Sequence, residues 1–271
     1  MRPILRIPPR TDKEDDSHMP EATAPVRCVG VTKFYAGVQA LADVSVDLHA
    51  GQCVCLVGDN GAGKSTLVKI LSGIMSPDSG EVQIDGRPVS LSRQAARQFG
   101  IEAVYQDLAL CDTLGAVANV MLGQEPIRFR LGPLRFIDWA AATESATRKI
   151  QEIGIELEDP TMPVRRLSGG QRQAIAIARA TVRGHRMVIF DEPTAALGVR
   201  QTKTTLELVR RVADQGVAVV MISHSLDDVF AVADRIVALR LGRMTLDARI
   251  GDTSREEVVA CMTGISPGPR P

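Results

Sequence analysis

The chain has 271 residues, long enough to bury the apolar core of one large domain or two smaller ones. Its 32 basic and 32 acidic side chains balance, so overall charge does not favour nucleic acid or an anionic membrane as a partner, although local patches are not excluded. No stretch approaches the roughly 18 apolar residues that cross a bilayer, so we expect any role at a membrane to depend on a partner protein.

Residues 1–25 combine several prolines with a cluster of charged side chains and have too little apolar content for a core. We interpret them as a disordered tail, and Met19 is an alternative start that the sequence does not decide. The five cysteines have no zinc-ligand spacing and no secretory leader before them, which favours a reduced, cytosolic setting. Cys53 and Cys55 lie within an apolar run, so we expect core thiols in preference to a redox or metal role.

From Val26 onwards the pattern changes to strands. VRCVGVT and VSVDLHAG alternate apolar and polar residues, as half-buried antiparallel strands do. By contrast, CVCLV, MVIF and VAVVMI are continuous apolar runs, typical of central strands covered on both faces. This mixture predicts an α/β fold with an antiparallel β flank.

Between residues 107 and 166 strand signals fade, which predicts a helical insertion. WAAATESATRKIQEIG within it favours a helix that ends at Gly154. A further helix is expected after Ser223, followed by a hairpin at Gly242.

The stretch GDNGAGKST, Gly58 to Thr66, matches G-x-x-x-x-G-K-[ST] between an apolar strand and an apolar-periodic run. Glycines let several backbone N–H groups point at one anion, and the next helix adds its positive end. Lys64 can then reach the β- and γ-phosphates, and the Ser65 hydroxyl can bind Mg²⁺. The alternative is a glycine-rich turn that only joins strand to helix. The expected nucleotide-binding residues of this loop are Gly58, Asn60, Gly61, Gly63, Lys64, Ser65 and Thr66.

Two adjacent carboxylates follow the strand in MVIFDEP. Asp191 lies at the carboxyl end of the strand, where ligands bind in open α/β sheets. Neighbouring side chains on extended backbone point in opposite directions, so the two acids are expected to differ in role. We assign Asp191 to Mg²⁺ and Glu192 to polarising the attacking water. The alternative is a pair of carboxylates that cap the next turn.

The stretch LSGGQRQ opens a run that otherwise favours a helix. Ser168 is suited to the N-cap of that helix. Gly169 and Gly170 each cost an interior helix position about 1 kcal/mol relative to alanine. A capping role and a ligand-binding role both fit this stretch locally.

The order of these motifs, with Gln106 between the phosphate loop and LSGGQ and with His224 in ISHS after MVIFDE, resembles the ATP-binding subunits of ABC transporters over about residues 26–250. The resemblance implies a P-loop NTPase core with an antiparallel β flank and an inserted helical subdomain. It sets the expected boundaries: tail 1–25, ATPase domain 26–255 with the insertion at 107–166, and a short C-terminal tail at 256–271.

The resemblance also implies roles for single residues. Tyr35 is similar to the aromatic that stacks on adenine, although a core tyrosine would fit as well. Gln106 is similar to the glutamine that senses Mg²⁺ and the attacking water and links to the transmembrane partner. His224 is similar to the histidine that contacts the γ-phosphate, whereas a lone histidine is more often structural.

In the same family two subunits meet head to tail. The resemblance therefore implies that ATP held by Lys64 of one chain is also contacted by the LSGGQ stretch of another, with hydrolysis separating the two. The stretch contributes Ser168, Gly169, Gly170 and Gln171. Gly198 stands where the family commonly has an aspartate that connects the two ATP sites, so that connection is expected to differ.

The sequence around the motifs, as in GDNGAGKSTLVKILSG, is similar to that of ATP-binding subunits in the monosaccharide-import branch, ribose- or fructose-like. That branch implies a permease, an extracytoplasmic sugar-binding protein, and a place on the cytoplasmic face of the membrane. An exporter subunit shares every catalytic motif and stays open. A soluble ABC ATPase acting on ribosomes or chromosomes is disfavoured, because neither a second ATPase domain nor room for a long coiled coil is found. A non-hydrolysing binding module is disfavoured by the complete set of catalytic residues.

Overall fold

The computed structural model describes residues 26–152, 157, 159–182, 185–195 and 197–265. The expected tail at 1–25, with Met19, lies outside the described residues. So does the predicted helix end at Gly154.

The core is a six-stranded sheet in the order β12-β11-β3-β10-β9-β6. All neighbours are parallel except β11 and β12, which form the predicted antiparallel hairpin at Gly242. The three apolar runs predicted as central strands are β3, β9 and β10, and their residues are buried apart from Asp191 at the end of β9. The strands are β3 (Cys53–Val57), β6 (Ile101–Val104), β9 (Met187–Asp191), β10 (Ala218–Ile222), β11 (Arg235–Arg240) and β12 (Arg243–Arg249).

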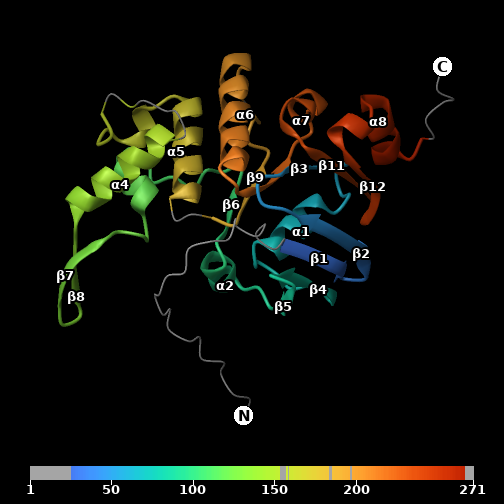
Figure 1. Ribbon diagram of the computed structural model, residues 1–271, viewed down its shortest axis with the longest axis horizontal. Coiled ribbons are helices and arrows are strands. Elements are labelled where there is room, and N and C mark those ends of the chain that lie inside the picture. Colours follow the sequence, from blue (N-terminus) through green and yellow to red (C-terminus); the bar gives the residue numbers. More distant parts are fainter. Residues whose placement is uncertain (1–25, 153–156, 158, 183–184, 196, 266–271) are drawn as a thin grey trace, which may run out of the picture.

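The two faces of this sheet pack against different layers (Figure 1). Because side chains alternate along a strand, Cys53 and Cys55 face one layer and Val54 and Leu56 the other. The first layer holds α5 (Gly169–Thr181), α6 (Val199–Asp214) and α7 (Leu226–Val232), and the second holds α1 (Lys64–Leu71). Both cysteines are completely buried, which confirms the prediction of core thiols.

An antiparallel sheet covers α1 from the other side, in the order β2-β1-β4-β5. It is the flank that the alternating segments predicted. The register pairs Val26 with Leu48 and with Ile84, all three buried, so its inner face joins the α1 core. The strands are β1 (Val26–Tyr35), β2 (Val38–Leu48), β4 (Ser79–Ile84) and β5 (Arg87–Val89), and α2 (Arg93–Gln98) follows them.

The insertion at 107–166 is not purely helical, contrary to our expectation. Its helices are α3 (Ala116–Met121) and α4 (Trp139–Glu152), with a short 3-10 turn, η1 (Val164–Arg166). Between them lies an antiparallel hairpin of β7 (Ile127–Leu131) and β8 (Leu134–Ile137). The alternation in IRFRL carried this signal, but helical patterns on both sides concealed it.

The region after residue 255 also differs from the expected tail. Arg255–Thr263 form helix α8, which follows a second 3-10 turn, η2 (Ile250–Asp252). The Ser254 hydroxyl caps α8 by accepting from the Glu257 amide, and Val258 is completely buried. Among the described residues, no helix is long and apolar enough to cross a membrane.

Candidate functional site

The loop between β3 and α1 holds the predicted phosphate-binding motif. Gly58 and Gly63 have φ values of 147° and 109°, which residues with a side chain rarely adopt. A Cβ built on Gly58 would lie 2.3 Å from the Leu239 carbonyl oxygen, and one on Gly63 would lie 2.7 Å from the Ala40 carbonyl oxygen. Gly63 is also the N-cap of α1 and supplies no side-chain cap. The loop therefore needs glycine at both positions, and it leaves the first amides of α1 as donors for an anion.

Lys64 begins α1 and points back into the loop. It is buried, and its ammonium donates hydrogen bonds to the carbonyl oxygens of Gly58, at 2.5 Å, and Asp59, at 3.0 Å. Burial lowers the pKa of Lys64, and the nearby charges of Glu192, Asp59 and Asp191 oppose that change. The cation thus lies within electrostatic reach of both predicted catalytic carboxylates.

Several residues of the loop are more accessible than Lys64. Asn60, Gly61 and Ser65 are exposed and Thr66 is half-buried. Ser65 therefore presents its hydroxyl at the solvent side of the first turn of α1.

Parallel pairing of β9 with β10 brings Glu192 and His224 together. Asp191 lies opposite Ile222, and the Glu192 amide donates to the Ile222 carbonyl oxygen at 3.0 Å. His224 follows β10, and its Nε2 lies 2.8 Å from Oε1 of Glu192. Glu192 has φ of 52°, a left-handed conformation that costs a residue with a side chain about 1–3 kcal/mol. Such strain clusters at functional sites.

Asp191 sits half-buried at the end of β9. Burial raises the pKa of its carboxyl, the Glu192 charge adds to that rise, and Lys64 and His224 act against it. Within the described ranges, no hydrogen-bond donor is found for this carboxylate. Its raised pKa and unused oxygens suit a cation as partner.

The LSGGQ stretch begins α5, as predicted. The Ser168 hydroxyl accepts from the Gln171 amide at 3.3 Å, and Oε1 of Gln171 accepts from the Ser168 amide at 3.0 Å. This reciprocal capping box satisfies two amides of the helix end. The predicted N-cap is confirmed, and Gln171 takes part in it.

The capping box does not account for the two glycines. A Cβ on Gly169 would lie 3.6 Å from Leu197, and one on Gly170 would lie 3.5 Å from Gln201, both ordinary contact distances. Neither glycine has a positive φ. Among the described residues, no contact or backbone conformation therefore requires glycine here, although each glycine weakens the helix.

The LSGGQ stretch and the phosphate loop lie apart within one chain. Figure 1 shows α5 on one side of β6 and β9 and α1 on the other, with the sheet between them. The structure thus gathers Lys64, Asp191, Glu192 and His224 but leaves Ser168 outside this group.

Tyr35 ends β1 on the antiparallel sheet. Its side chain is 41% exposed, and its hydroxyl contacts Sδ of Met75 at 3.0 Å. It is not a core tyrosine, so stacking on adenine remains a prediction.

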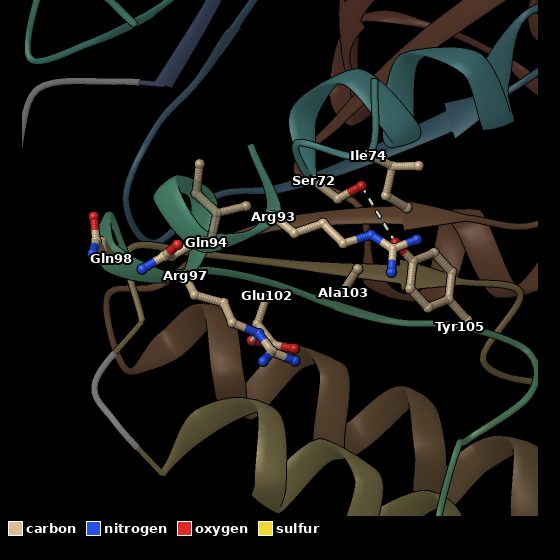
Figure 2. A pocket seen from close by; sticks show the side chains of 10 residues that line it. Ser72, Ile74, Arg93, Gln94, Arg97, Gln98, Glu102, Ala103 and Tyr105 are labelled. Carbon is tan, nitrogen blue, oxygen red and sulfur yellow. Dashed lines mark hydrogen bonds and ion pairs between the residues drawn. The ribbon is translucent and has the colours of Figure 1, made fainter. Parts of the chain in front are cut away.

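Gln106 is exposed just after β6, beside a pocket of about 660 Å³. Figure 2 shows that Arg93 and Arg97 reach into this pocket from α2, and Tyr105 lines it from the end of β6. The Tyr105 hydroxyl bonds Oγ of Ser72 at 3.3 Å. The pocket is therefore framed by charged, aromatic and hydroxyl groups next to Gln106.

Sequence reasoning missed the connection between the Gln106 segment and α5. Arg179 donates to the carbonyl oxygens of Leu108, at 2.7 Å, and Ala109, at 2.8 Å. Arg172 pairs with Asp112 at 2.6 Å. Arginines on a helix carry no sequence signal for backbone acceptors more than sixty residues away.

A second missed contact ties the Glu192 segment to α7. The Thr194 hydroxyl donates to Oδ2 of Asp228 at 2.7 Å. This bond holds together the two segments that carry Glu192 and His224. The acidic first turn of α7 was the only available signal.

Comparison with known proteins gives independent evidence on the family of this chain. A family model described as ABC transporter matches residues 41–195. Fructose import ATP-binding protein FrcA of Rhizobium meliloti is 43% identical over 247 residues, covering 89% of this chain and 94% of that protein. Ribose import ATP-binding protein RbsA 3 of Rhizobium etli is 41% identical over 250 residues, 92% of this chain. The chain spans 48% of that second relative.

Solved structures show the same fold. The structure of cbiO1 from Clostridium perfringens, part of the ABC transporter complex cbiONQ, has a TM-score of 0.74 at 25% identity, covering 88% of this chain and 93% of that one. A dimeric ATP-binding cassette, solved in a post-hydrolysis state with ADP and phosphate, has a TM-score of 0.69 at 27% identity, covering 83% of this chain and 98% of its own.

Proposed function

This chain belongs to the ABC transporter family and is an ATP-binding and ATP-hydrolysing subunit, and from that premise we propose that it drives import of a sugar through a separate transmembrane permease. The 43% identity to a fructose import subunit of nearly the same length supports the cargo class. The observation that carries the chemistry is the contact between Glu192 and His224 beside the phosphate loop.

The phosphate loop binds the nucleotide. Amides from Gly58 to Thr66 donate to the phosphates, and Lys64 moves its hydrogen bonds from the loop carbonyls to the β- and γ-phosphate oxygens. Tyr35 stacks on the base.

The side chains near the loop fit Mg²⁺. This ion keeps several waters and takes one or two protein ligands along with phosphate oxygens, so few protein ligands are needed. Asp191, which has no hydrogen-bond donor among the described residues, and the exposed Ser65 hydroxyl supply suitable oxygens, and Gln106 adds an amide oxygen. When bound, the ion neutralises charge on the β- and γ-phosphates.

Glu192 and His224 act on the attacking water. The Glu192 carboxylate accepts a proton from the water, which raises its nucleophilicity toward the γ-phosphorus. His224 holds that carboxylate through Nε2 and contacts the γ-phosphate. The positive φ of Glu192 occurs directly after β9, and its carboxylate contacts His224.

A second copy of the chain completes the site. The glycines at 169 and 170 are explained by neither packing nor backbone conformation in one chain, which supports close approach of a phosphate from elsewhere. The N-terminus of α5 adds a positive end to that approach. Two chains therefore close head to tail on two ATP molecules, and loss of the γ-phosphate weakens the closure.

The pocket beside Gln106 receives the permease on the cytoplasmic face of the membrane. Its arginines and Tyr105 offer both charged and aromatic contacts to a helix end. An extracytoplasmic sugar-binding protein would deliver the cargo on the other side.

Complementation between two inactive variants tests the shared site. Lys64→Ala and Ser168→Arg should each lose hydrolysis as homodimers. Ser168→Arg should still bind ATP as a monomer, because Lys64 is intact. Mixing the two variants restores one complete site per dimer, so phosphate release should reappear. A mixture that stays inactive, or a Ser168→Arg monomer that no longer binds ATP, would contradict the head-to-tail assignment.

Transport direction needs a second measurement. With a permease of this system in vesicles whose outside corresponds to the cytoplasm, ATP should drive labelled ribose or fructose out into the medium where the ATPase sits. Movement of sugar away from the ATPase side would identify an exporter.

A further inference from the structure

The hairpin of β7 and β8 stands apart from the rest of the fold. Its two strands pair only with each other among the described strands. Figure 1 shows it extending away from α4, well clear of the central sheet. Leu131 pairs with Leu134, so only Gly132 and Pro133 form the tip.

The register of the hairpin pairs apolar side chains with apolar ones and arginine with arginine. Phe129 and Leu131 point to one face and Arg130 between them to the other; the register shifts between Ile127 and Phe129, so this alternation begins at Phe129. Opposite residues on β8 match them in kind: leucine opposes leucine, arginine opposes arginine, and phenylalanine opposes phenylalanine. The stacked rings of Phe129 and Phe136, 4.4 Å between centroids, confirm that the paired residues share a face.

The apolar side chains of the hairpin face solvent. Leu131 is 65% exposed, Leu134 58% and Phe129 52%. They are contiguous across the two strands, unlike single exposed apolar residues, which need no explanation. Such a cluster indicates a surface that is covered in the working protein.

The paired Arg130 and Arg135 make the opposite face cationic, and Arg128 adds its charge at the register shift beside it. Arg128, Arg130 and Arg135 are exposed, and none of them forms an ion pair within the part of the chain that the structure describes. No acidic residue occurs from 127 to 137. The flanking acids serve the backbone instead: Glu125 accepts from the Gly123 amide, and Asp138 caps α4. A local charge of three therefore sits on a chain whose overall charge is zero.

We propose that this hairpin binds the surface of an anionic lipid bilayer, tip first. Counting from the tip, leucines come first, arginines second and phenylalanines third, with successive rungs about 3.3 Å apart. The leucines then reach the acyl boundary, while the arginines meet lipid phosphates at the headgroup level. A protein docked on the apolar face would leave the arginines in water, whereas tip-first insertion engages both faces.

Flotation with lipid vesicles tests this contact, and the only tryptophan of the chain reports whether a second copy covers the hairpin instead. Trp139 lies two residues beyond β8 and is 53% exposed. The full chain is mixed with vesicles of phosphatidylcholine alone or of phosphatidylcholine with phosphatidylglycerol. We expect the protein to float only with the anionic vesicles and less so as salt is raised, while Trp139 emission without lipid stays independent of protein concentration.

Matched variants separate the two parts of the contact. Arg130→Gln with Arg135→Gln should weaken partitioning about 25-fold, roughly fivefold for each arginine. Leu131→Ser with Leu134→Ser should weaken it on anionic vesicles while leaving its salt dependence. Arg249→Gln and Val259→Ser, exposed positions elsewhere, are the controls. Circular dichroism and basal ATP hydrolysis should be unchanged throughout, because the hairpin lies outside the catalytic residues.

Three outcomes would overturn the proposal. One is equal binding to neutral and anionic vesicles. Another is unchanged binding by both hairpin double variants. The third is a blue shift that grows with protein concentration in the absence of lipid, which would show that a second copy covers the hairpin. None of them bears on ATP hydrolysis, so failure here leaves the proposed function intact.

Discussion

Nε2 of His224 lies 2.8 Å from a carboxylate oxygen of Glu192, and the two side chains come from the ends of neighbouring parallel strands. The contact predicts that Glu192→Gln keeps the shape of the site and removes the proton acceptor. Turnover should fall about 10²- to 10⁴-fold while ATP binding persists, and an ATP-bound dimer should accumulate. Phosphate release and size-exclusion chromatography with ATP measure the two effects.

The control for this variant is Glu207→Gln, an exposed glutamate on α6. It should hydrolyse ATP like the parent chain. Normal turnover in Glu192→Gln would remove Glu192 from the role of base.

Gly170→Ala should separate stability from activity. The new methyl would sit 3.5 Å from Gln201, and Gly170 does not have a positive φ, so folding should be unaffected or gain up to about 1 kcal/mol. Hydrolysis should nevertheless drop, because the methyl would face the partner's γ-phosphate. Urea unfolding and phosphate release measure the two.

Gly251→Ala is the matched control, since its methyl would meet nothing within 4 Å and its φ is not positive. Equal hydrolysis by Gly170→Ala and Gly251→Ala would mean that no phosphate approaches Gly170.

Asn119 should be important for the stability of the inserted subdomain. It is completely buried, accepts from the Cys111 amide at 2.7 Å, and donates to the carbonyl oxygens of Cys111, Leu114 and Gly115. Asn119→Leu removes the acceptor of the Cys111 amide and the side-chain donor to the three carbonyls, which keep their backbone donors, and should cost roughly 1–3 kcal/mol in the free energy of unfolding. Gln98→Leu, an exposed change on α2, should stay within about 0.5 kcal/mol in the same urea titration. Similar losses in both would show that Asn119 has no special role.

The buried thiol of Cys28 should make the free energy of unfolding fall as the pH rises above 9.0. Burial raises the pKa of its thiol from 9.0 to about 12. The folded chain therefore holds this proton where the unfolded chain has released it. Its contribution is fully present below pH 9.0 and is lost as the pH rises toward about 12, with a slope of about 1.4 kcal/mol per pH unit.

Cys28→Ala removes this contribution. The free energy of unfolding, measured against pH above 9.0, should fall more steeply in the parent chain than in the variant. Parallel curves would mean that the thiol ionises alike in both states.

The central strands and the phosphate loop were predictable because their signals are local. A fully apolar run such as CVCLV fits a strand covered on both faces, and the loop motif dictates its own backbone. The Ser168 cap was equally local, since a serine with glutamine three residues later forms a capping box.

The features that could not be predicted from the sequence depend on contacts with residues far away in the chain or on short, ambiguous patterns. Helix α8 is stable because Val258 is buried in the core shared with α5 to α7, and its own sequence is only weakly amphipathic. The β7–β8 hairpin was missed because its alternation is short and lies between two helices. The bonds from Arg179 to the Gln106 segment join residues about 70 positions apart, beyond any periodicity.

The Arg179 bonds link the segment after Gln106 mechanically to α5. The first residues of that helix would face the nucleotide of the other chain in the proposed dimer. In that dimer, a movement of the permease at one subunit would displace α5 against the ATP that the other subunit holds. Each subunit would contact the permease on its own side and act on the ATP bound by the other subunit, so hydrolysis at either site would depend on both subunits.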